Sequence, residues 1–257
     1  MTKKRKSVKK KKVNAILYDK LNKKMTEHKT PEISKALYDR IKLVRRDFGS
    51  LLFHFTRTPD QKEAIKIKTN DYGSTTIWPA SAWGVLSKIL REGRLIGTSK
   101  WTYGKNCVCF TEAPIQEFNS IFSLVEIAAS RQEKPRYEPY GIAVSKKWLF
   151  EKGGRPAIYD HPDTFASVPK DQKYRFVPYD PVRGIDFTWE REWRIKVDHL
   201  ELDPRETLVV VPTSEEAFEL VYEFADLEAD GDEDGPSGVY HRAKWLAVSL
   251  DIFGFGQ

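Results

Sequence analysis

The sequence predicts a mixed α+β domain in which helices surround a split or strongly bent sheet. Many short apolar and β-branched runs are interleaved with a few helical patterns, and no segment is repeated. The strand patterns do not alternate regularly with long helices, so a doubly wound parallel sheet is not expected. With 257 residues the chain is long enough to bury a real core. We therefore place a single α+β domain at residues 50–257.

The charge of the chain is divided unevenly between its N-terminus and the rest. Residues 1–47 carry 17 Lys/Arg against 5 Asp/Glu, whereas the remainder carries 26 against 32. Residues 1–12 contain eight basic side chains and no acid, which predicts a disordered basic arm. Positions 3–12 suggest contact with nucleic acid or a ribosome. A solubilising tail, or one that folds against the acidic loop predicted at 223–234, is an equally supported interpretation.

A helical segment is predicted between the arm and the domain, over residues 13–49. Thr30 is a suitable N-cap, Pro31 suits the first helical position, and Gly49 suits the end of the helix. Apolar residues recur between these limits at helical spacing. The segment is expected to pack on the domain as an amphipathic helix, with a partner-binding helix as the alternative.

Within the domain, each element is predicted from its apolar period. Helices are expected at 79–92 with Gly93 as the terminating glycine, and at 115–131, 146–150 and 214–224. Strands are expected at 51–56, 107–112, 140–144, 156–159, 174–178, 206–211 and 245–253. Arg94-Leu95 is expected to continue into a loop, and another loop is expected over the acidic stretch 223–234.

One further strand is predicted over residues 186–196, and it carries the strongest candidate site. A period of two places Trp189 and Trp193 on one face and Glu190, Glu192 and Arg194 on the other. Such a strand holds its charged side chains at fixed spacing and can therefore carry a charged site. The alternative is a solvated face whose ion pairs contribute little to stability.

Several classes of protein are not indicated by the sequence. It contains no GxGxxG, Walker phosphate loop, HExxH or GxSxG motif, and its five histidines lack metal-ligand spacing. Cys107 and Cys109 fit neither a zinc pair nor a redox motif, so we expect buried thiols and no metal. No apolar run is long enough for a membrane span, and no signal peptide is recognised. A cytoplasmic protein is therefore expected.

The order of short motifs resembles the ADP-ribosyltransferase fold, especially toxins of the DarT type. A His-x-Thr strand at His54 and Thr56 precedes a helix with the pattern Leu86 to Leu95. Cys-Phe-Thr-Glu at 109–112, Tyr-Gly-Ile at 140–142 and Glu-x-Glu-Trp-Arg at 190–194 then follow. The order is also similar to that of AbiGi-like abortive-infection proteins. The resemblance covers residues 50–200, the possible catalytic core.

The resemblance implies that NAD is the substrate, and it assigns roles to individual residues. His54 and Thr56 would contact a ribose of NAD, and Phe110 or Tyr140 would stack on nicotinamide. Glu192 would be the catalytic glutamate, with Glu190 two residues before it and Arg194 among the cofactor-binding residues.

Two features of the family pattern have no clear match in this chain. The serine-threonine-serine element that accompanies Glu-x-Glu in many members is absent. Arg94 and Arg155 are the candidates for an arginine that binds the NAD phosphates.

The predicted function is transfer of ADP-ribose from NAD to nucleic acid or protein, in a bacterial or phage conflict system. A cognate antitoxin or defence partner would then be expected, and no membrane. NAD hydrolysis is a related alternative. A non-catalytic defence-associated binding module or antitoxin is the second class. The third is an RNA-end phosphotransferase, which would need a basic pocket formed by Lys146, Lys147 and Arg194.

Overall fold

The structure is a computed structural model that describes the larger part of the chain. The described residues are 34–37, 40, 49–59, 65–68, 75–78, 80–118, 122, 137–230 and 238–255. The chain divides into two compact units, Met1–Arg46 and Asp47–Gln257. In the first unit, residues 35–37 and 40 are helical. The predicted basic arm 1–12 and the predicted Thr30 cap lie outside the described residues.

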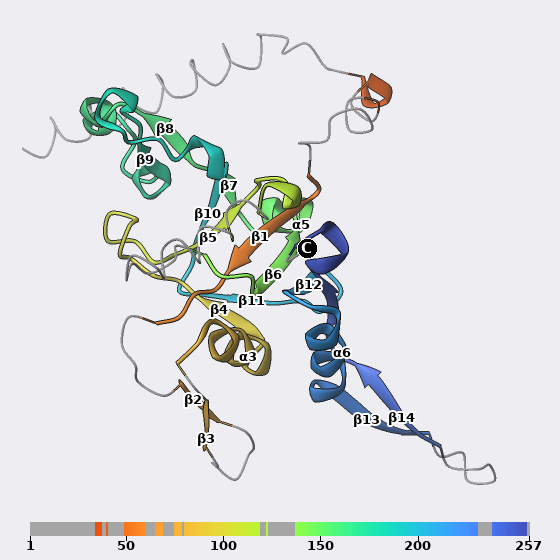
Figure 1. Cartoon of the computed structure of the whole chain (residues 1–257). Coiled ribbons are helices and arrows are strands. Elements are labelled where there is room, and N and C mark those ends of the chain that lie inside the picture. Colours follow the sequence, from red (N-terminus) through yellow and green to blue (C-terminus); the bar gives the residue numbers. More distant parts are fainter. Residues whose placement is uncertain are drawn as a thin grey trace, which may run out of the picture. The chain divides into compact units, whose positions relative to one another are not determined.

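Seven strands of the second unit form one mixed sheet (Figure 1). Their order is β15 (Leu246–Ser249), β12 (Thr207–Val211), β6 (Gly141–Ser145), β1 (Leu51–Phe55), β5 (Cys107–Thr111), β10 (Glu192–Lys196) and β7 (Arg155–Pro156). Only β12 and β15 pair in parallel; the other neighbours are antiparallel. This order places β1, β5 and β10 side by side, although they are far apart in the sequence. The predicted mixed α+β class is confirmed.

Four two-stranded pairs accompany the sheet in the described part of the chain. They are β4 (Arg94–Ile96) with β11 (His199–Glu201), β2 (Ile65–Lys68) with β3 (Thr75–Trp78), β8 (Ile158–Asp160) with β9 (Phe176–Pro178), and β13 (Ala225–Asp230) with β14 (Gly238–Ala243). Short 3-10 turns are η1 (Pro162–Ala166), η2 (Lys173–Arg175), η3 (Pro181–Arg183), η4 (Thr188–Glu190) and η5 (Asp251–Phe253).

The helices of the domain begin and end at residues suited to those positions. In α3 (Ala82–Glu92), the Ser81 side chain accepts a hydrogen bond from the Gly84 amide, and Gly93 ends the helix with a φ of 65°. The predicted role of Gly93 is therefore confirmed. In α6 (Ser214–Glu223), Thr213 and Glu216 form a capping box. The short α5 (Lys146–Glu151) follows β6 directly, capped by Ser145.

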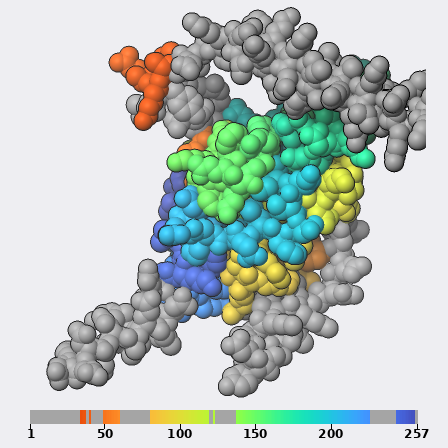
Figure 2. Space-filling view, turned by 180° about the vertical axis from the view of Figure 1, so that it is seen from behind, coloured from red at the N-terminus to blue at the C-terminus, as the bar shows by residue number. Residues whose placement is uncertain are grey.

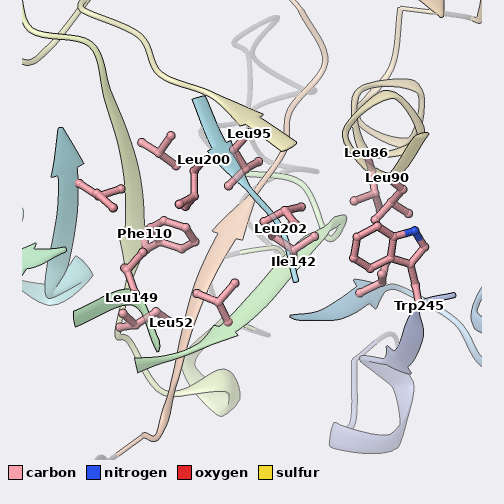
Figure 3. Packing of buried hydrophobic residues seen from close by; sticks show 14 of the residues in the cluster. Leu52, Leu86, Leu90, Leu95, Phe110, Ile142, Leu149, Leu200, Leu202 and Trp245 are labelled. Atoms are coloured by element: carbon pink, nitrogen blue, oxygen red, sulfur yellow. The ribbon is translucent and has the colours of Figure 1, made fainter. Parts of the chain in front are cut away.

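The central strands bury a different apolar cluster on each face of the sheet. On one face, Leu52, Phe110 and Ile142 belong to a cluster that also contains α3 side chains. Figure 3 shows Leu86 and Leu90 of α3 beside Trp245. On the other face, Phe53, Phe55 and Ala143 pack with Phe118 and Phe122. The period of two along β1 and β6 therefore separates two cores, with no open face at the centre of the sheet.

The prediction of a strand over residues 186–196 is wrong for the first half of that range. Thr188–Glu190 forms η4, Arg191 has a left-handed φ of 46°, and β10 begins only at Glu192. The cause is local, because the Asp186 carboxylate accepts hydrogen bonds from the backbone amide and the hydroxyl of Thr188. Such a turn competes with strand pairing.

Other element boundaries also differ from the prediction. The acidic stretch is not a continuous loop, because Ala225–Asp230 is β13 and pairs with β14. Its alternating apolar and acidic residues have the period of a strand. Arg94–Ile96 is strand β4 instead of a loop, and the strand predicted at 245–253 is shortened to Leu246–Ser249.

Candidate functional site

Glu192 and Arg194 form a buried ion pair on β10. They are alternate residues of the strand, so their side chains share one face, and their ladder partners on β5 are Thr111 and Cys109. Arg194 Nε donates to Glu192 Oε1 at 2.8 Å, and Arg194 Nη2 donates to Glu192 Oε2 at 2.9 Å. The side chains are only 6% and 13% exposed. Both oxygens of the Glu192 carboxylate are therefore held in a bidentate pair.

The Arg194 guanidinium also binds three backbone carbonyl groups on two segments of the chain. Its Nη1 lies 3.3 Å from the Trp101 carbonyl oxygen, 2.7 Å from that of Tyr174 and 3.2 Å from that of Phe176. Burial lowers the pKa of Arg194, but the hydrogen bonds and negative charge of Glu192 outweigh this effect, so its pKa is raised overall. The raised pKa keeps Arg194 charged, and its hydrogen bonds tie β10 to the loops around it.

Glu190 lies outside the strand, on η4, and is buried to 4% exposure. Its Oε2 accepts a hydrogen bond of 2.9 Å from the Tyr137 hydroxyl, and its backbone oxygen accepts one of 2.5 Å from Thr111. The Tyr137 ring lies edge-on to Trp189, with centroids 6.5 Å apart, and Trp189 is 43% exposed. A buried carboxylate thus lies beside a partly exposed aromatic pair.

Tyr159 contacts the backbone of β10 at its first residue. Its hydroxyl oxygen accepts a 2.7 Å hydrogen bond from the Glu192 backbone amide. Burial raises the pKa of Tyr159 to about 12, with smaller contributions in the same direction from the charges of Glu192 and Glu190. Tyr137 and Tyr159 were not singled out by the sequence reasoning. Tyr159 lies in a predicted strand, but no spacing connects either tyrosine to the glutamates.

Cys109 lies on the same face as this cluster, opposite Arg194 in the ladder. Burial, followed by the negative charge of Glu192, raises the pKa of the Cys109 thiol. Both cysteines are free thiols; Cys107 is buried and Cys109 is partly buried. The structure therefore places a protonated thiol here.

His54 and Phe110 lie on the opposite face of the sheet from Glu192. Phe53 and Glu192 both oppose Thr111 in the ladder, so these three side chains share one face. His54, one residue along from Phe53, points the other way: its Nδ1 lies 2.7 Å from the Cys109 carbonyl oxygen, and its ring packs 5.7 Å from Phe110. Burial lowers the pKa of His54, partly offset by this hydrogen bond. The sheet therefore separates His54 and Phe110 from the glutamates.

Thr56 and Tyr140 are engaged in contacts between elements. Thr56 Oγ1 lies 2.9 Å from the Ala82 carbonyl oxygen and 3.0 Å from that of Tyr140. The Tyr140 hydroxyl donates a 2.6 Å hydrogen bond to Glu216, and its ring packs edge-on to Trp83. Burial and the bond to Glu216 raise the pKa of Tyr140. These residues join the ends of α3 and α6 to the sheet.

A second charged group on the His54 face was missed at the sequence level. Glu112 accepts hydrogen bonds from the Lys146 ammonium and, at 2.8 Å, from the Trp193 indole. Lys146 also lies over the Trp193 ring. Glu112 directly follows β5, and Lys146 begins α5, so only the folded sheet brings them together.

The cations considered for phosphate binding do not gather in one place. The Lys147 side chain is 85% exposed and lies 3.9 Å from Glu151, whereas Arg194 is buried on the other face from the Lys146 pair. Arg94 pairs with Glu92, and Arg155 donates to the carbonyl oxygens of Phe150 and Gly154. The contacts of these cations do not form a common phosphate site.

Comparisons with known proteins do not assign this site. No protein-family model, curated protein or solved structure matches the chain. Among the residues that the structure describes, no group of three or more His, Cys, Asp or Glu side chains is arranged to hold a metal ion. Within the same residues, none of the helices has the length and apolarity needed to cross a membrane.

Proposed function

We propose that this chain is an ADP-ribosyltransferase-like enzyme of a bacterial or phage conflict system, which breaks the glycosidic bond of NAD and transfers ADP-ribose to nucleic acid or protein. One observation carries the proposal: Glu190 is buried, receives the Tyr137 hydroxyl, and lies beside the partly exposed Trp189. The mixed α+β fold is compatible with the proposal.

The chemistry of NAD cleavage suits this group of side chains. When the bond between ribose C1′ and the nicotinamide nitrogen breaks, nicotinamide leaves with the electron pair and positive charge develops on the ribose. A carboxylate held in a water-poor site stabilises that charge. The nicotinamide ring of NAD is itself cationic, and an aromatic face such as that of Trp189 attracts cations. An acceptor oxygen or nitrogen then bonds to C1′ and loses a proton.

The contacts favour Glu190 over Glu192 as the stabilising carboxylate. Both oxygens of Glu192 are bound to Arg194, which in turn fixes three carbonyl groups. Using Glu192 on a substrate would therefore disturb a buried ion pair, at a cost of several kcal/mol. We assign Glu192 to positioning β10 and the adjoining loops, and Glu190 to the chemistry.

The proposal is tested by measuring nicotinamide release from NAD by the full chain, with and without nucleic acid or cell lysate. Glu190→Gln keeps the size of the side chain and is expected to lower turnover by at least about 100-fold, as for a lost electrostatic contact in a transition state. Tyr137→Phe should lower it less. Glu201→Gln, on the exposed β11, is the matched control and should keep full turnover.

Each outcome of this assay bears on the proposal. Equal turnover by the wild type, Glu190→Gln and the control would overturn the role of Glu190. Thermal melting of each variant shows whether a lost activity follows from a lost fold. If Glu190→Gln unfolds, the turnover of Tyr137→Phe tests the role of Glu190 instead, because this variant keeps the ring and removes only the hydroxyl that donates to Glu190.

A second candidate, a non-catalytic binding module or antitoxin, is favoured by a different observation. The sheet separates His54 from Glu192, so the NAD contacts expected from the resemblance do not face one another. The same preparation distinguishes the two candidates. Absence of turnover in every condition, together with absence of NAD binding by calorimetry, would support the binding module.

A further inference from the structure

An aromatic and basic face lies at the loop between β4 and β5. Trp101 is 73% exposed and Tyr103 is 46% exposed. Lys100 lies over the Trp101 ring at 5.6 Å, and Lys173 lies over the Phe165 ring at 4.3 Å. A single exposed ring is common at a protein surface, but neighbouring exposed rings that form one patch mark an interaction site.

The face is continuous because its segments contact one another. Tyr103 stacks on Phe165 with centroids 4.3 Å apart, and Lys196 lies over Tyr174 at 5.8 Å. In Figure 2, the yellow segment that includes the β4–β5 loop adjoins the green segment that carries η1 and η2. We call the surface formed by Lys100, Trp101, Tyr103, Lys105, Lys173 and Lys196 the Trp101 face.

The loop that presents the two rings is preformed. Tyr103 and Gly104 both have positive φ, 53° and 75°, and the Lys105 amide donates to the Thr102 carbonyl oxygen at 3.2 Å. The buried Thr102 hydroxyl also bonds to the carbonyl oxygens of Thr98 and Lys105. A left-handed tyrosine is a strained choice that persists only where its surroundings enforce it.

The buried Arg194 side chain joins the two segments of the Trp101 face, the β4–β5 loop and residues 174–176. Its guanidinium binds the carbonyl oxygen of Trp101 on one side and those of Tyr174 and Phe176 on the other. The ion pair with Glu192 supports this link. The exposed rings and lysines are therefore mounted on a rigid base, which reduces the entropy lost when a ligand binds.

The charge of the face contrasts with that of the domain. Residues 98–106, 162–166, 170–176 and 196–198 contain six Lys/Arg and three Asp, Asp163, Asp171 and Asp198. Asp198 accepts a hydrogen bond from Asn106 at 2.9 Å. Residues 48–257 as a whole carry 26 basic and 32 acidic side chains. A basic surface on an acidic domain indicates an anionic ligand.

We propose that the Trp101 face binds single-stranded nucleic acid. Unpaired bases stack on exposed aromatic rings, and lysines placed between the rings neutralise the phosphates. A base-paired duplex hides its base faces and offers the rings nothing on which to stack. This inference is independent of NAD turnover, because the face includes neither Glu190 nor Tyr137.

The test measures fluorescence anisotropy of labelled single strands of about 12 nucleotides, oligouridylate and oligothymidylate, and of a duplex of the same length. The full chain is titrated between about 50 and 200 mM salt. Trp101→Ala is expected to weaken single-strand binding by at least about 5-fold, the loss of one stacked base. Lys105→Ala with Lys173→Ala should also reduce the dependence of affinity on salt. The RNA and DNA strands show which sugar is preferred.

Matched variants separate this face from the basic N-terminal arm. Phe218→Ala removes an exposed ring on α6, and Lys147→Ala removes an exposed lysine of α5; both should leave affinity unchanged. Binding through the arm alone would leave Trp101→Ala equal to Phe218→Ala, and this result would overturn the proposal. Equal affinity for duplex and single strand, or no binding at all, would also overturn it. Glu201→Gln, on the exposed β11, should also bind like the wild type, and because none of these variants changes Glu190 or Tyr137, the binding result is read separately from NAD turnover.

Discussion

The Glu192 carboxylate and the Arg194 guanidinium form two parallel hydrogen bonds, of 2.8 and 2.9 Å, at the start of β10. Because alternate residues of a strand share a face, the pair is local in sequence yet buried in the fold. Arg194 also donates hydrogen bonds to the carbonyl oxygens of Trp101, Tyr174 and Phe176. The pair thus joins the sheet to the loops that carry the Trp101 face.

Replacement of Glu192 by Gln should destabilise the fold by about 3–5 kcal/mol, because it leaves the buried Arg194 charge without its partner. The free energy of unfolding in urea measures this effect. Glu151→Gln is the control, since it removes an exposed charge whose pair contributes little. A loss no larger than that of the control would show that the ion pair does not hold β10.

Gly141 is required where β6 approaches β1. A Cβ atom at this position would lie 2.4 Å from the His54 backbone oxygen and 2.9 Å from the Phe55 Cα atom. Gly141→Ala should therefore lower the free energy of unfolding by about 1–3 kcal/mol through overpacking. Gly49→Ala places its Cβ at an ordinary 3.5 Å contact and should change stability little. Equal unfolding midpoints for the two variants would contradict this account.

Tyr159→Phe should cost about 1–3 kcal/mol, because the Glu192 amide loses the oxygen that accepts its hydrogen bond. A pH effect is expected as well. The native pKa of Tyr159 is about 12, above the usual 10.0, so its contribution is complete below pH 10 and is lost as the pH rises through 12. Urea unfolding at neutral and alkaline pH tests both effects. Tyr222→Phe keeps an exposed ring on α6 and should match the wild type at neutral pH, whereas an equal loss there would refute the role of the Tyr159 hydroxyl.

The regular elements could be predicted because their signals are local. The apolar stripe of α3 ending at Gly93, and the β-branched run of β12, determine their structure within a few residues. The strand over 186–196 could not be predicted in full, because a side chain of Asp186 forms a turn that hydrophobic period does not reveal. Apolar and acidic residues alternate in β13 with the period of a strand, but the acidic content of the segment favoured the prediction of a loop.

The candidate site was less predictable, because it depends on which strands are neighbours. The sequence alone places Glu192 and Arg194 on one face, and the structure agrees. It does not determine the register between β1 and β5, which places His54 behind the sheet from Glu192. Nor does it connect Tyr137 with Glu190, or Glu112 with Lys146. A shift of one residue in register would have reversed which side chains meet.

His54 should make the stability of the fold depend on pH in a predictable direction. Burial holds its native pKa below 6.5, the ordinary value that applies to the unfolded chain. Between these two pKa values the unfolded chain binds more protons, so the free energy of unfolding rises with pH and falls on acidification below about 6.5.

His54→Gln removes this titration, and its stability curve should be flatter between pH 5 and 7 than that of the wild type. Carboxylates titrate in both proteins, so the difference between the two curves isolates His54. His199→Gln, on the exposed surface of β11, controls for the substitution itself and should match the stability of the wild type at pH 7. Parallel curves for His54→Gln and the wild type would mean that His54 titrates alike in the folded and unfolded chains, contrary to its enclosed position against Cys109 and Phe110.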